Sequence, residues 1–395
     1  MGDGNRAIMS RVLLICEYPT LNGCEQSLLA ILPLLIADGF TFEAIAPASG
    51  ALARAFGELG IRVLPLEISD SPTGKLTQQQ KREQIATAIA GTKTDLVHAN
   101  SISMGRLLGP VTADLGIPSI SHVRDIVRFS GQASIDLNRH SRLLAVSCAT
   151  RQYHVSTGMR DDLTFVAYNG VNLARFRPRA PTGWLHAELG LPHNALLVGA
   201  VGQLILRKGH DVLVAAAESA VSQLPNVYYV VAGERFSQKN EAQRFEAKIR
   251  QRVTDGPLAG RFHFLGVRDN IPDLLPELTL LAHPARQEPL GRVLLEAGAS
   301  GVPVVATDVG GTREIFGTDA AELVPPDDPQ ALARAIVKLA SDAPLRQRLA
   351  LAALSQIATR FSVQLAAATL AQHYREVLAV SAARAACVAS VAPGR

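Results

Sequence analysis

The chain has 395 residues, of which 48% are hydrophobic and 19% are charged, and its formal net charge is +4. This length exceeds the usual size of one domain and supplies enough apolar residues for two cores. The positive charge is spread along the sequence without a Lys/Arg block, so a nucleic-acid-binding tract is not indicated, and a small anionic ligand stays open. The four cysteines show no CxxC spacing, so they favour neither a disulfide framework nor a zinc site and indicate a reducing cytoplasm.

The chain begins with MGDGNRAIMSRVLLICEYP, which contains a basic residue and a short apolar run. This run lacks the length and the small-residue cleavage pattern of a signal peptide, and it predicts a first β-strand instead. No stretch reaches the roughly 18 uninterrupted apolar residues that a membrane-spanning helix needs. We therefore expect a cytoplasmic protein, and contact with the inner face of a membrane stays open.

Short β-branched and aliphatic runs alternate with segments of helical period in the first half of the chain. A helix is expected from Glu25 to Asp38, and Pro33 should kink it without necessarily ending it. This alternation is the βαβ pattern of a parallel sheet. The predicted strands are residues 11–17, 42–47, 62–68, 95–100, 118–123, 143–147 and 163–168.

The same alternation restarts after RPRAPTG, residues 177–183, where the Pro- and Gly-rich composition predicts an interdomain linker. The strands expected beyond it are residues 196–201, 227–232, 262–265, 278–283, 304–307 and 322–324. From Pro329 onward the period is helical, and a long final helix is expected near residues 361–379. The predicted division is domain 1–178, domain 179–365, a C-terminal helix 366–380 that packs back on the first domain, and a disordered tail 381–395.

Two doubly wound α/β domains place a ligand cleft at the carboxyl ends of their strands. We therefore expect the functional site to draw residues from both halves of the chain. The most informative segment is HPARQEPLGRVLLEAGASGVPVVATDVGGTREI, which begins at His283.

Within this segment, Pro289 and Gly291 predict a strand-to-helix turn. Glu288 then lies in the loop and Glu296 about one turn inside the following helix, on a face that can point back to the cleft. The backbone N–H groups of Leu290, Gly291 and Arg292 would lie at the helix N-terminus, which favours a phosphate. A solvated pair of helix glutamates is the alternative reading of the two carboxylates.

The spacing of Glu288 and Glu296 resembles the E-x7-E signature of retaining GT-B glycosyltransferases, in particular glycosyltransferase family 4 (glycosyl transferases group 1). The resemblance extends over nearly the whole chain. It implies the GT-B fold, two Rossmann-like domains with an interdomain cleft, and transfer of a sugar from a nucleotide diphosphate sugar to an acceptor hydroxyl with retained anomeric configuration. It also implies no metal and no cofactor, and we prefer a UDP-sugar to a GDP-sugar.

The family's roles carry over to matching positions. Glu288 corresponds to the glutamate associated with the donor sugar hydroxyls, and Glu296 to the one associated with the ribose. Gly310 and Gly311 allow close backbone approach to a ligand, although a tight turn would also use them. The resemblance further implies that the first domain binds the acceptor and the second binds the donor.

A second segment, VGAVGQLILRKGHDVLVAAA, runs from a strand through a loop that carries Arg207 and Lys208. Two cations near the cleft could neutralise a pyrophosphate leaving group in place of a bound metal. Lys208 matches the family lysine. Gln203 stands where the family often has Arg, so either Arg207 supplies the charge or Gln203 gives a neutral hydrogen bond.

The remaining candidates are single residues. Gly23 resembles part of the family's glycine-rich loop, and His122, at a strand end, resembles the histidine that faces the donor sugar. His98 is interpreted as structural.

Gly233 and Arg268 lie where the family holds the nucleotide base. Asn169 and Gly170 suit a turn with positive φ and receive no chemical role.

Two other functions stay open on sequence grounds, because one fold serves several activities. A nucleotide-sugar epimerase would consume the donor without an acceptor, and a non-catalytic binding protein would bind it without turnover. The acceptor has no readable code and can be a saccharide, a lipid-linked sugar or a small molecule.

Overall fold

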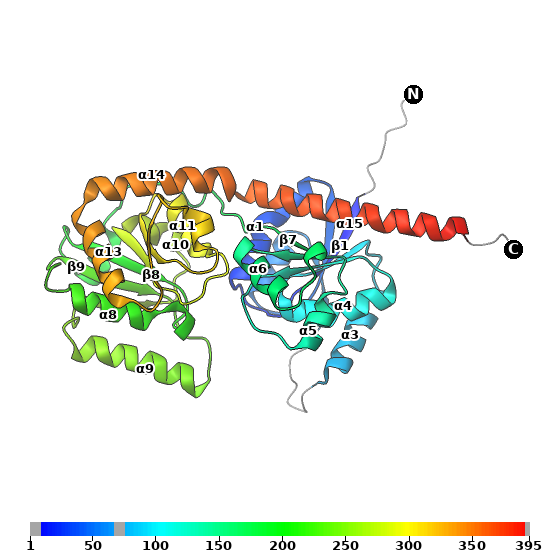
Figure 1. Ribbon diagram of the computed structural model, residues 1–395, viewed down its shortest axis with the longest axis horizontal. Helices are drawn as coiled ribbons and strands as arrows, with labels where there is room; N and C mark the ends of the chain where they lie inside the picture. Colours follow the sequence, from blue (N-terminus) through cyan, green and yellow to red (C-terminus); the bar gives the residue numbers. More distant parts are fainter. Residues whose placement is uncertain (1–8, 67–75, 392–395) are drawn as a thin grey trace, which may run out of the picture. The chain divides into compact units, whose positions relative to one another are not determined.

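The structure is a computed structural model that describes residues 9–66 and 76–391, with side chains described as far as residue 387. The chain divides into two units, Met1–Gly170 with Val363–Arg395, and Val171–Ser362. Each unit is an α/β unit with helices on both faces of a parallel sheet (Figure 1). The expected fold class, two doubly wound Rossmann-like domains, is confirmed.

Among the described residues of the first unit, seven strands form one sheet in the order β3-β2-β1-β4-β5-β6-β7. The strand order reverses between β1 and β4: the chain adds β2 and β3 on one side of β1 and then β4 to β7 on the other side. The strands are β1 Ser10–Ile15, β2 Phe40–Ala46, β3 Arg62–Pro65, β4 Leu96–Ala99, β5 Ser119–Val123, β6 Arg142–Ala145 and β7 Thr164–Val166. The helices are α1 Gly23–Ala37, α2 Ala51–Glu58, α3 Gln78–Ala90, α4 Ile102–Leu115, α5 Gly131–Leu137, α6 Cys148–Ser156 and α15 Val363–Val391, with a short 3-10 turn η1 Asp161–Leu163.

The side chains of β1 point alternately to the two faces of the sheet, and apolar residues cover both faces. Val12 and Leu14 pack with Leu28 of α1 in one apolar cluster, whereas Leu13 and Ile15 pack with α3 and α4 in another. Successive side chains of a strand point to opposite faces, so an unbroken apolar strand predicts helices on both sides. The predicted helix across Pro33 is confirmed, because α1 continues past this residue to Ala37.

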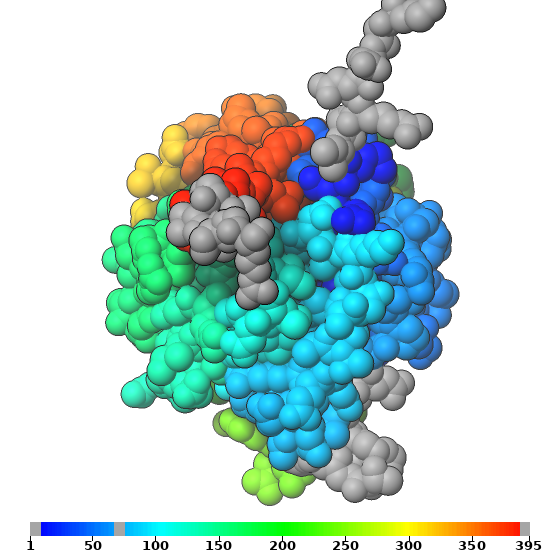
Figure 2. Space-filling model, turned by 90° about the vertical axis from the view of Figure 1, so that its right-hand side faces the viewer, coloured from blue at the N-terminus to red at the C-terminus, as the bar shows by residue number. Residues whose placement is uncertain are grey.

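The last helix, α15, belongs to the first unit and packs on α1. Leu370, Ala371 and Tyr374 are buried in the same cluster as Leu28 and Leu32. Figure 2 shows α15, in red, directly beside the blue elements that begin the chain. The face of the first sheet that carries α1 is therefore completed by residues from the far end of the sequence.

The second unit has six strands among its described residues, in the order β10-β9-β8-β11-β12-β13, with the reversal between β8 and β11. Its core packs β8 and β9 against α8 and α13. The strands are β8 Leu196–Val201, β9 Val227–Ala232, β10 Phe262–Gly266, β11 Leu280–His283, β12 Val304–Thr307 and β13 Glu322–Val324. The helices are α7 Trp184–Leu189, α8 His210–Ala220, α9 Asn240–Asp255, α10 Ile271–Leu274, α11 Arg292–Ala299, α12 Thr312–Phe316, α13 Pro329–Ser341 and α14 Ala343–Arg360, with 3-10 turns η2 Leu206–Lys208 and η3 Leu275–Glu277.

The division between the units differs from the predicted linker at 177–183, which lies inside the second unit. The N–H of Val171 donates to the carbonyl of Phe361 at 2.7 Å, so the chain joins the second unit already at this residue. The segment that follows is held there by Glu277, whose buried carboxylate accepts hydrogen bonds from the N–H groups of Thr182 and Gly183 at 2.6 and 2.9 Å. Residues 177–182 are exposed, as a loop-like composition predicts, and hydrogen bonds to Glu277 attach this segment to the second unit.

The C-terminal end also differs from the expectation of a disordered tail after residue 380, because α15 continues to Val391. Residues 381–391 are rich in alanine and contain no glycine or proline, and alanine has the highest helix propensity. Part of the predicted strand 62–68 and the tail beyond 391 lie outside the described residues. In residues 9–66 and 76–391, no helix combines the length and apolar character needed to span a bilayer.

Substituting Leu370 by Ala tests the attachment of α15. Leu370 is 2% exposed in the first unit's core, so the change should lower the free energy of unfolding by about 2–5 kcal/mol. Val380→Ala is the matched control on the same helix, because Val380 is 51% exposed and should change stability by less than about 0.5 kcal/mol. Urea denaturation measures both, and equal effects would show that α15 does not support this core.

Candidate functional site

The predicted charged residues Arg207, Lys208 and Glu288 of the second unit lie on the loops that follow β8 and β11, the two strands between which the strand order reverses. The predicted Gly233, Arg268 and the pair Gly310 and Gly311 follow β9, β10 and β12. Ligands of doubly wound sheets bind outside the carboxyl ends of the strands at such a reversal. Lys208 lies in η2, after β8, and Glu288 lies in the loop after β11. The Nζ of Lys208 donates to Oε2 of Glu288 at 2.5 Å. The structure therefore joins the two residues that the sequence placed in separate motifs.

Glu288 has a second partner, His283, which the sequence analysis did not select. The Nε2 of His283 lies 2.7 Å from the same Oε2 of Glu288. Burial alone would raise the pKa of Glu288, but the Lys208 ammonium and the His283 ring hold it well below its usual value. Burial lowers the pKa of His283 in spite of its carboxylate partner. A neutral His283 thus donates Nε2–H to an ionised Glu288.

Arg286 fixes the loop that carries Lys208, and it was also missed from the sequence. Its guanidinium donates two hydrogen bonds of 2.8 Å to Asp211 and one of 2.6 Å to Asp327. It also donates to the carbonyl of Leu206 at 2.7 Å, while its backbone N–H donates to the carbonyl of Arg207 at 2.8 Å. One side chain therefore ties together the loops after β8, β11 and β13.

A glycine lets the same two loops meet closely. Gly209 has a φ of 68°, and a Cβ at this position would lie 1.9 Å from the carbonyl oxygen of Pro284. No other residue type fits there without moving the backbone. The guanidinium of Arg207 is half-buried and has no hydrogen bond within the part of the chain that the structure describes, so it is available to a ligand. Gln203 lies in the same loop and is half-buried.

The turn before α11 has the predicted form. Gly291 precedes the helix with a φ of 100°, and a Cβ there would meet Cδ1 of Leu294 at 2.6 Å. Pro289 and Leu290 lie between Glu288 and this glycine, and Leu290 is buried. No side chain caps the start of α11 among the described residues, so the N–H group of Arg292 is open to an anionic ligand.

Glu296 lies on α11 and is buried, so the reading as a solvated helix glutamate is wrong. Its Oε1 accepts a hydrogen bond of 2.7 Å from Nε of Arg292, one turn earlier. Burial raises the pKa of Glu296, although the Arg292 guanidinium opposes the shift. Glu288, which precedes α11, and Glu296, which lies inside it, therefore have pKa shifts of opposite direction.

The predicted glycines are backbone features. A Cβ on Gly233 would lie 2.0 Å from the carbonyl oxygen of Gly202, and the N–H of Gly233 donates to the carbonyl of Gly266 at 2.7 Å. The ends of β8, β9 and β10 thus approach each other without side chains. Gly310 has a φ of 53°, and Gly311 donates its N–H to the carbonyl of Glu288 at 3.0 Å.

Arg268 is engaged within the second unit. Its guanidinium pairs with the carboxylate of Glu188, and its Nε donates to the carbonyl of Leu265 at 3.1 Å. Arg268 could therefore contact the nucleotide base only through its backbone, or through its side chain after the ion pair with Glu188 breaks. Its assignment to the nucleotide stays a prediction.

The first unit contributes a chain of buried hydrogen bonds at the ends of β4 and β5. Nδ1 of His122 lies 2.7 Å from Nε2 of His98, and Nδ1 of His98 lies 2.6 Å from the hydroxyl of Tyr374 on α15. Burial lowers the pKa of His98 to about 3 and that of His122 well below its usual value, and the nearby Arg124 charge lowers both further. Both rings are neutral, so the tautomer of His122 is set through His98.

Gly23 is the first residue of α1, and a Cβ added there would meet no atom within 4 Å. This position is therefore open but does not require glycine. The predicted positive φ at Asn169 and Gly170 is wrong, because neither is among the described residues with positive φ. Asn169 instead accepts a hydrogen bond of 2.5 Å from Nη1 of Arg124.

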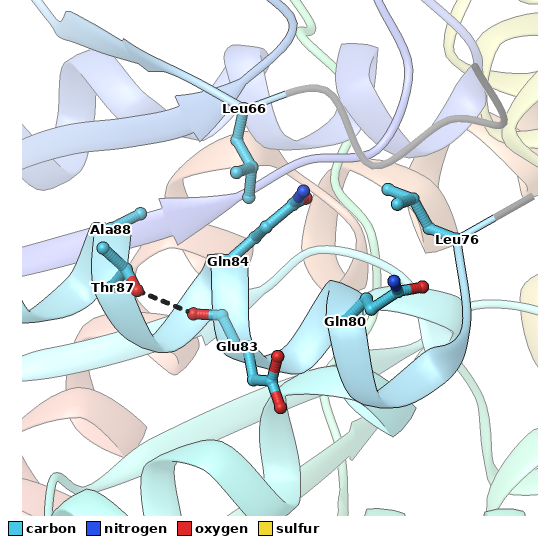
Figure 3. Close-up of a pocket in the computed structure, with 7 residues that line it drawn as sticks. All are labelled: Leu66, Leu76, Gln80, Glu83, Gln84, Thr87 and Ala88. Carbon is cyan, nitrogen blue, oxygen red and sulfur yellow. Dashed lines mark hydrogen bonds between the residues drawn. The ribbon is translucent and has the colours of Figure 1, made fainter. Parts of the chain in front are cut away.

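A cavity of about 480 Å³ lies apart from these residues, between Leu66 and α3 (Figure 3). Gln80, Glu83 and Gln84 of α3 line it, and Thr87 donates its hydroxyl to the carbonyl of Glu83 at 2.9 Å. It contains none of the predicted site residues. In the two described stretches, no cluster of three His, Cys, Asp or Glu residues has the arrangement of a metal site.

Comparisons with known proteins identify a family model and relatives that are all glycosyltransferases. The sequence model of the family described as "Glycosyl transferases group 1" matches residues 185–356. The lipopolysaccharide core biosynthesis mannosyltransferase LpsB of Rhizobium meliloti (strain 1021) is 30% identical over 254 residues, which are 64% of this chain and 70% of the relative. The D-inositol 3-phosphate glycosyltransferase of Streptomyces bingchenggensis (strain BCW-1) is 32% identical over 227 residues, 56% of this chain and 49% of that protein.

Among solved structures, Anabaena HepE in complex with UDP superimposes with a TM-score of 0.80 at 26% identity, covering 93% of this chain and all of that one. The matched region of the family contains Lys208, Glu288 and Glu296. By sequence and by fold, this chain belongs to the glycosyl transferases group 1 family.

Proposed function

We propose that this protein is a retaining, metal-independent glycosyltransferase of family 4 that transfers a hexose from a UDP-sugar to an acceptor hydroxyl. The observation that carries the proposal is the buried carboxylate of Glu288, held by Lys208 and His283 at the strand-order reversal of the second sheet. UDP as the nucleotide is supported by Anabaena HepE, whose structure contains UDP. The proposal assigns the donor to the second unit and the acceptor to the first.

Lys208 suits a leaving diphosphate. An ammonium group has three N–H donors, and one of them goes to Glu288. The other two can contact phosphate oxygens while the ion pair persists. With the Arg207 guanidinium and the open N–H group of Arg292 at the start of α11, these donors would stabilise the charge that develops on the leaving group, which is the largest electrostatic demand of the reaction.

Glu288 suits binding better than proton transfer. Lys208 and His283 keep its pKa well below its usual value, so it stays ionised at physiological pH and is a weak base. An ionised carboxylate accepts hydrogen bonds from sugar hydroxyls. We assign Glu288 to the donor sugar and Glu296 to the ribose, and His122 is the first unit's contribution to the donor sugar.

The bond changes follow from these roles. The acceptor oxygen forms a bond to the anomeric carbon on the face from which the diphosphate leaves, and a donor phosphate oxygen takes the acceptor's proton. No protein nucleophile is needed on this route. A carboxylate stabilised as strongly as Glu288 would be a poor nucleophile for a double displacement.

Nucleotide binding can be measured first, by thermal shift in the presence of EDTA. UDP at large excess over its dissociation constant should stabilise the native protein by a few kcal/mol, and GDP and ADP should do so less. Lys208→Met should remove most of the UDP shift because the phosphate loses its cation. A shift that appears only when a divalent metal is added would contradict metal-independent binding.

Glu288→Gln should lower kcat by about 10²–10³, since a charged acceptor for the donor sugar is lost. The matched control is Glu322→Gln, because Glu322 pairs with Lys338 at 2.6 Å in the same unit, away from the site. Initial rates at saturating donor and acceptor measure both variants. Wild-type turnover in Glu288→Gln would remove this residue from the reaction.

Tyr374→Phe tests whether the buried chain orients His122. Loss of the hydroxyl should change the ¹⁵N chemical shifts of both His98 and His122, lower kcat by up to about tenfold and cost about 1 kcal/mol of stability. Tyr229→Phe is the control, because the Tyr229 hydroxyl is buried without a hydrogen-bond partner among the described residues. Unchanged histidine shifts in Tyr374→Phe would show that the tautomers are set elsewhere.

A further inference from the structure

Arg124 follows β5 in the first unit, and within residues 9–66 and 76–391 its hydrogen bonds all go to neutral oxygens. Its Nε and Nη2 donate to the carbonyl and the side-chain Oδ1 of Asn100 at 3.1 and 2.9 Å, and its Nη1 donates to Oδ1 of Asn169 at 2.5 Å. In the described stretches none of its hydrogen bonds goes to a carboxylate. A guanidinium has five N–H donors, so two are left after these three contacts.

The amide of Asn100 is oriented by this contact. A guanidinium can only donate, so the atom that faces Nη2 of Arg124 must be the amide oxygen, and Nδ2 must point the other way. Asn100 is 1% exposed, and Nδ2 is a buried donor with no hydrogen-bond partner among the described residues. Buried polar groups are nearly always hydrogen-bonded, so an unpaired NH₂ requires an explanation.

The nearby acid does not fill this place. The carboxylate of Glu25 accepts from the N–H of Asn22 at 3.1 Å and from Sγ of Cys24 at 3.0 Å, at the start of α1. Its charge favours the ionised form of Arg124, whose pKa burial lowers. Joining the ends of β4, β5 and β7 explains the three hydrogen bonds of Arg124 but not the free Nδ2 of Asn100.

Among the described residues, the side-chain hydrogen-bonding groups that stay unpaired at Asn100 and Arg124 are all donors. The NH₂ of Asn100 is an unpaired buried donor on a side chain that the Arg124 guanidinium contacts at 2.9 Å, and such a donor beside a cation matches a group that accepts several hydrogen bonds and carries negative charge. A carboxylate or a phosphate meets these conditions, because it accepts several hydrogen bonds and carries negative charge. The Arg124 charge acts on both His98 and His122, so the place lies close to the histidine pair.

We propose that Asn100 and Arg124 form an oxyanion site in the first unit, which binds a carboxylate or phosphate group of the glycosyl acceptor. This inference rests on the proposed function, in which the first unit receives the acceptor. It narrows the acceptor to an anionic molecule. The site lies beside the reversal of strand order between β1 and β4, where ligands of such sheets bind.

The test uses the full chain, with inorganic phosphate and acetate as separate probes at constant ionic strength. Each is titrated with and without saturating UDP, and the melting temperature is followed. Wild type should show a rise with at least one probe in the presence of UDP. The probe that acts distinguishes a phosphate-bearing from a carboxylate-bearing acceptor.

Asn100→Asp is the decisive variant. The aspartate keeps the volume and an oxygen for Arg124, but it replaces the free NH₂ with a negative oxygen. We expect the apparent affinity for the probe to fall by about tenfold to a hundredfold, with the melting temperature of the unliganded protein unchanged or raised. Asn100→Ser, which also lacks the amide donor, should lose the response and serves if the aspartate variant does not fold.

Arg62→Gln is the charge control, because Arg62 is an exposed cation at the start of β3 and should leave the response intact. An equal response in Asn100→Asp, or none in wild type, would overturn the proposal and assign Nδ2 to bound water. A response that disappears with UDP would overturn it too, because the oxyanion would be the donor's phosphate. A separate sample contains UDP without either probe. If UDP does not bind there, the result counts against the proposed function and not against this site.

Discussion

The second unit depends on a buried carboxylate that cannot be left unpaired. Glu288 is removed from water, and an ionised carboxylate in such a place is costly unless charged or hydrogen-bonding partners surround it. Lys208 and His283 are those partners, and each comes from a different loop or strand end. The requirement to pair one charge therefore determines how the loops after β8 and β11 fold against each other.

The rest of this edge of the sheet supports that pairing. Arg286 connects three loops through Asp211, Asp327 and the backbone beside Lys208, and Gly209 lets two of them come into contact. A loop that is already ordered loses little conformational freedom when a ligand binds. The first unit shows a similar arrangement, in which Arg124 joins three strand ends and Tyr374 forms a hydrogen bond with His98 of the histidine pair.

The sequence predicted those features that depend on neighbours along the chain. Apolar runs predicted the strands, and the spacing of Glu288, Gly291 and Glu296 predicted a turn into a helix, because each pattern is local. Arg286 was missed because its partners, Asp211 and Asp327, are distant in sequence and nothing in the spacing relates them. Tyr374 lies 276 residues from His98, and only the packing of α15 on the first unit brings the two together. Asn100 and Arg124 likewise meet only through the alignment of β4 with β5.

The packing of α15 on the first unit affects the order in which the two units can fold during synthesis on the ribosome. A ribosome releases Leu28 and Leu32 early, yet Leu370, Ala371 and Tyr374, which cover them, emerge only after the whole second unit. The second unit is continuous in sequence and can fold as soon as it has been synthesised, whereas the first has an uncovered apolar face until then. Exposed apolar surface of this kind is where chaperones bind and where aggregation starts. During synthesis, the domain that is begun first is therefore the one that is completed last.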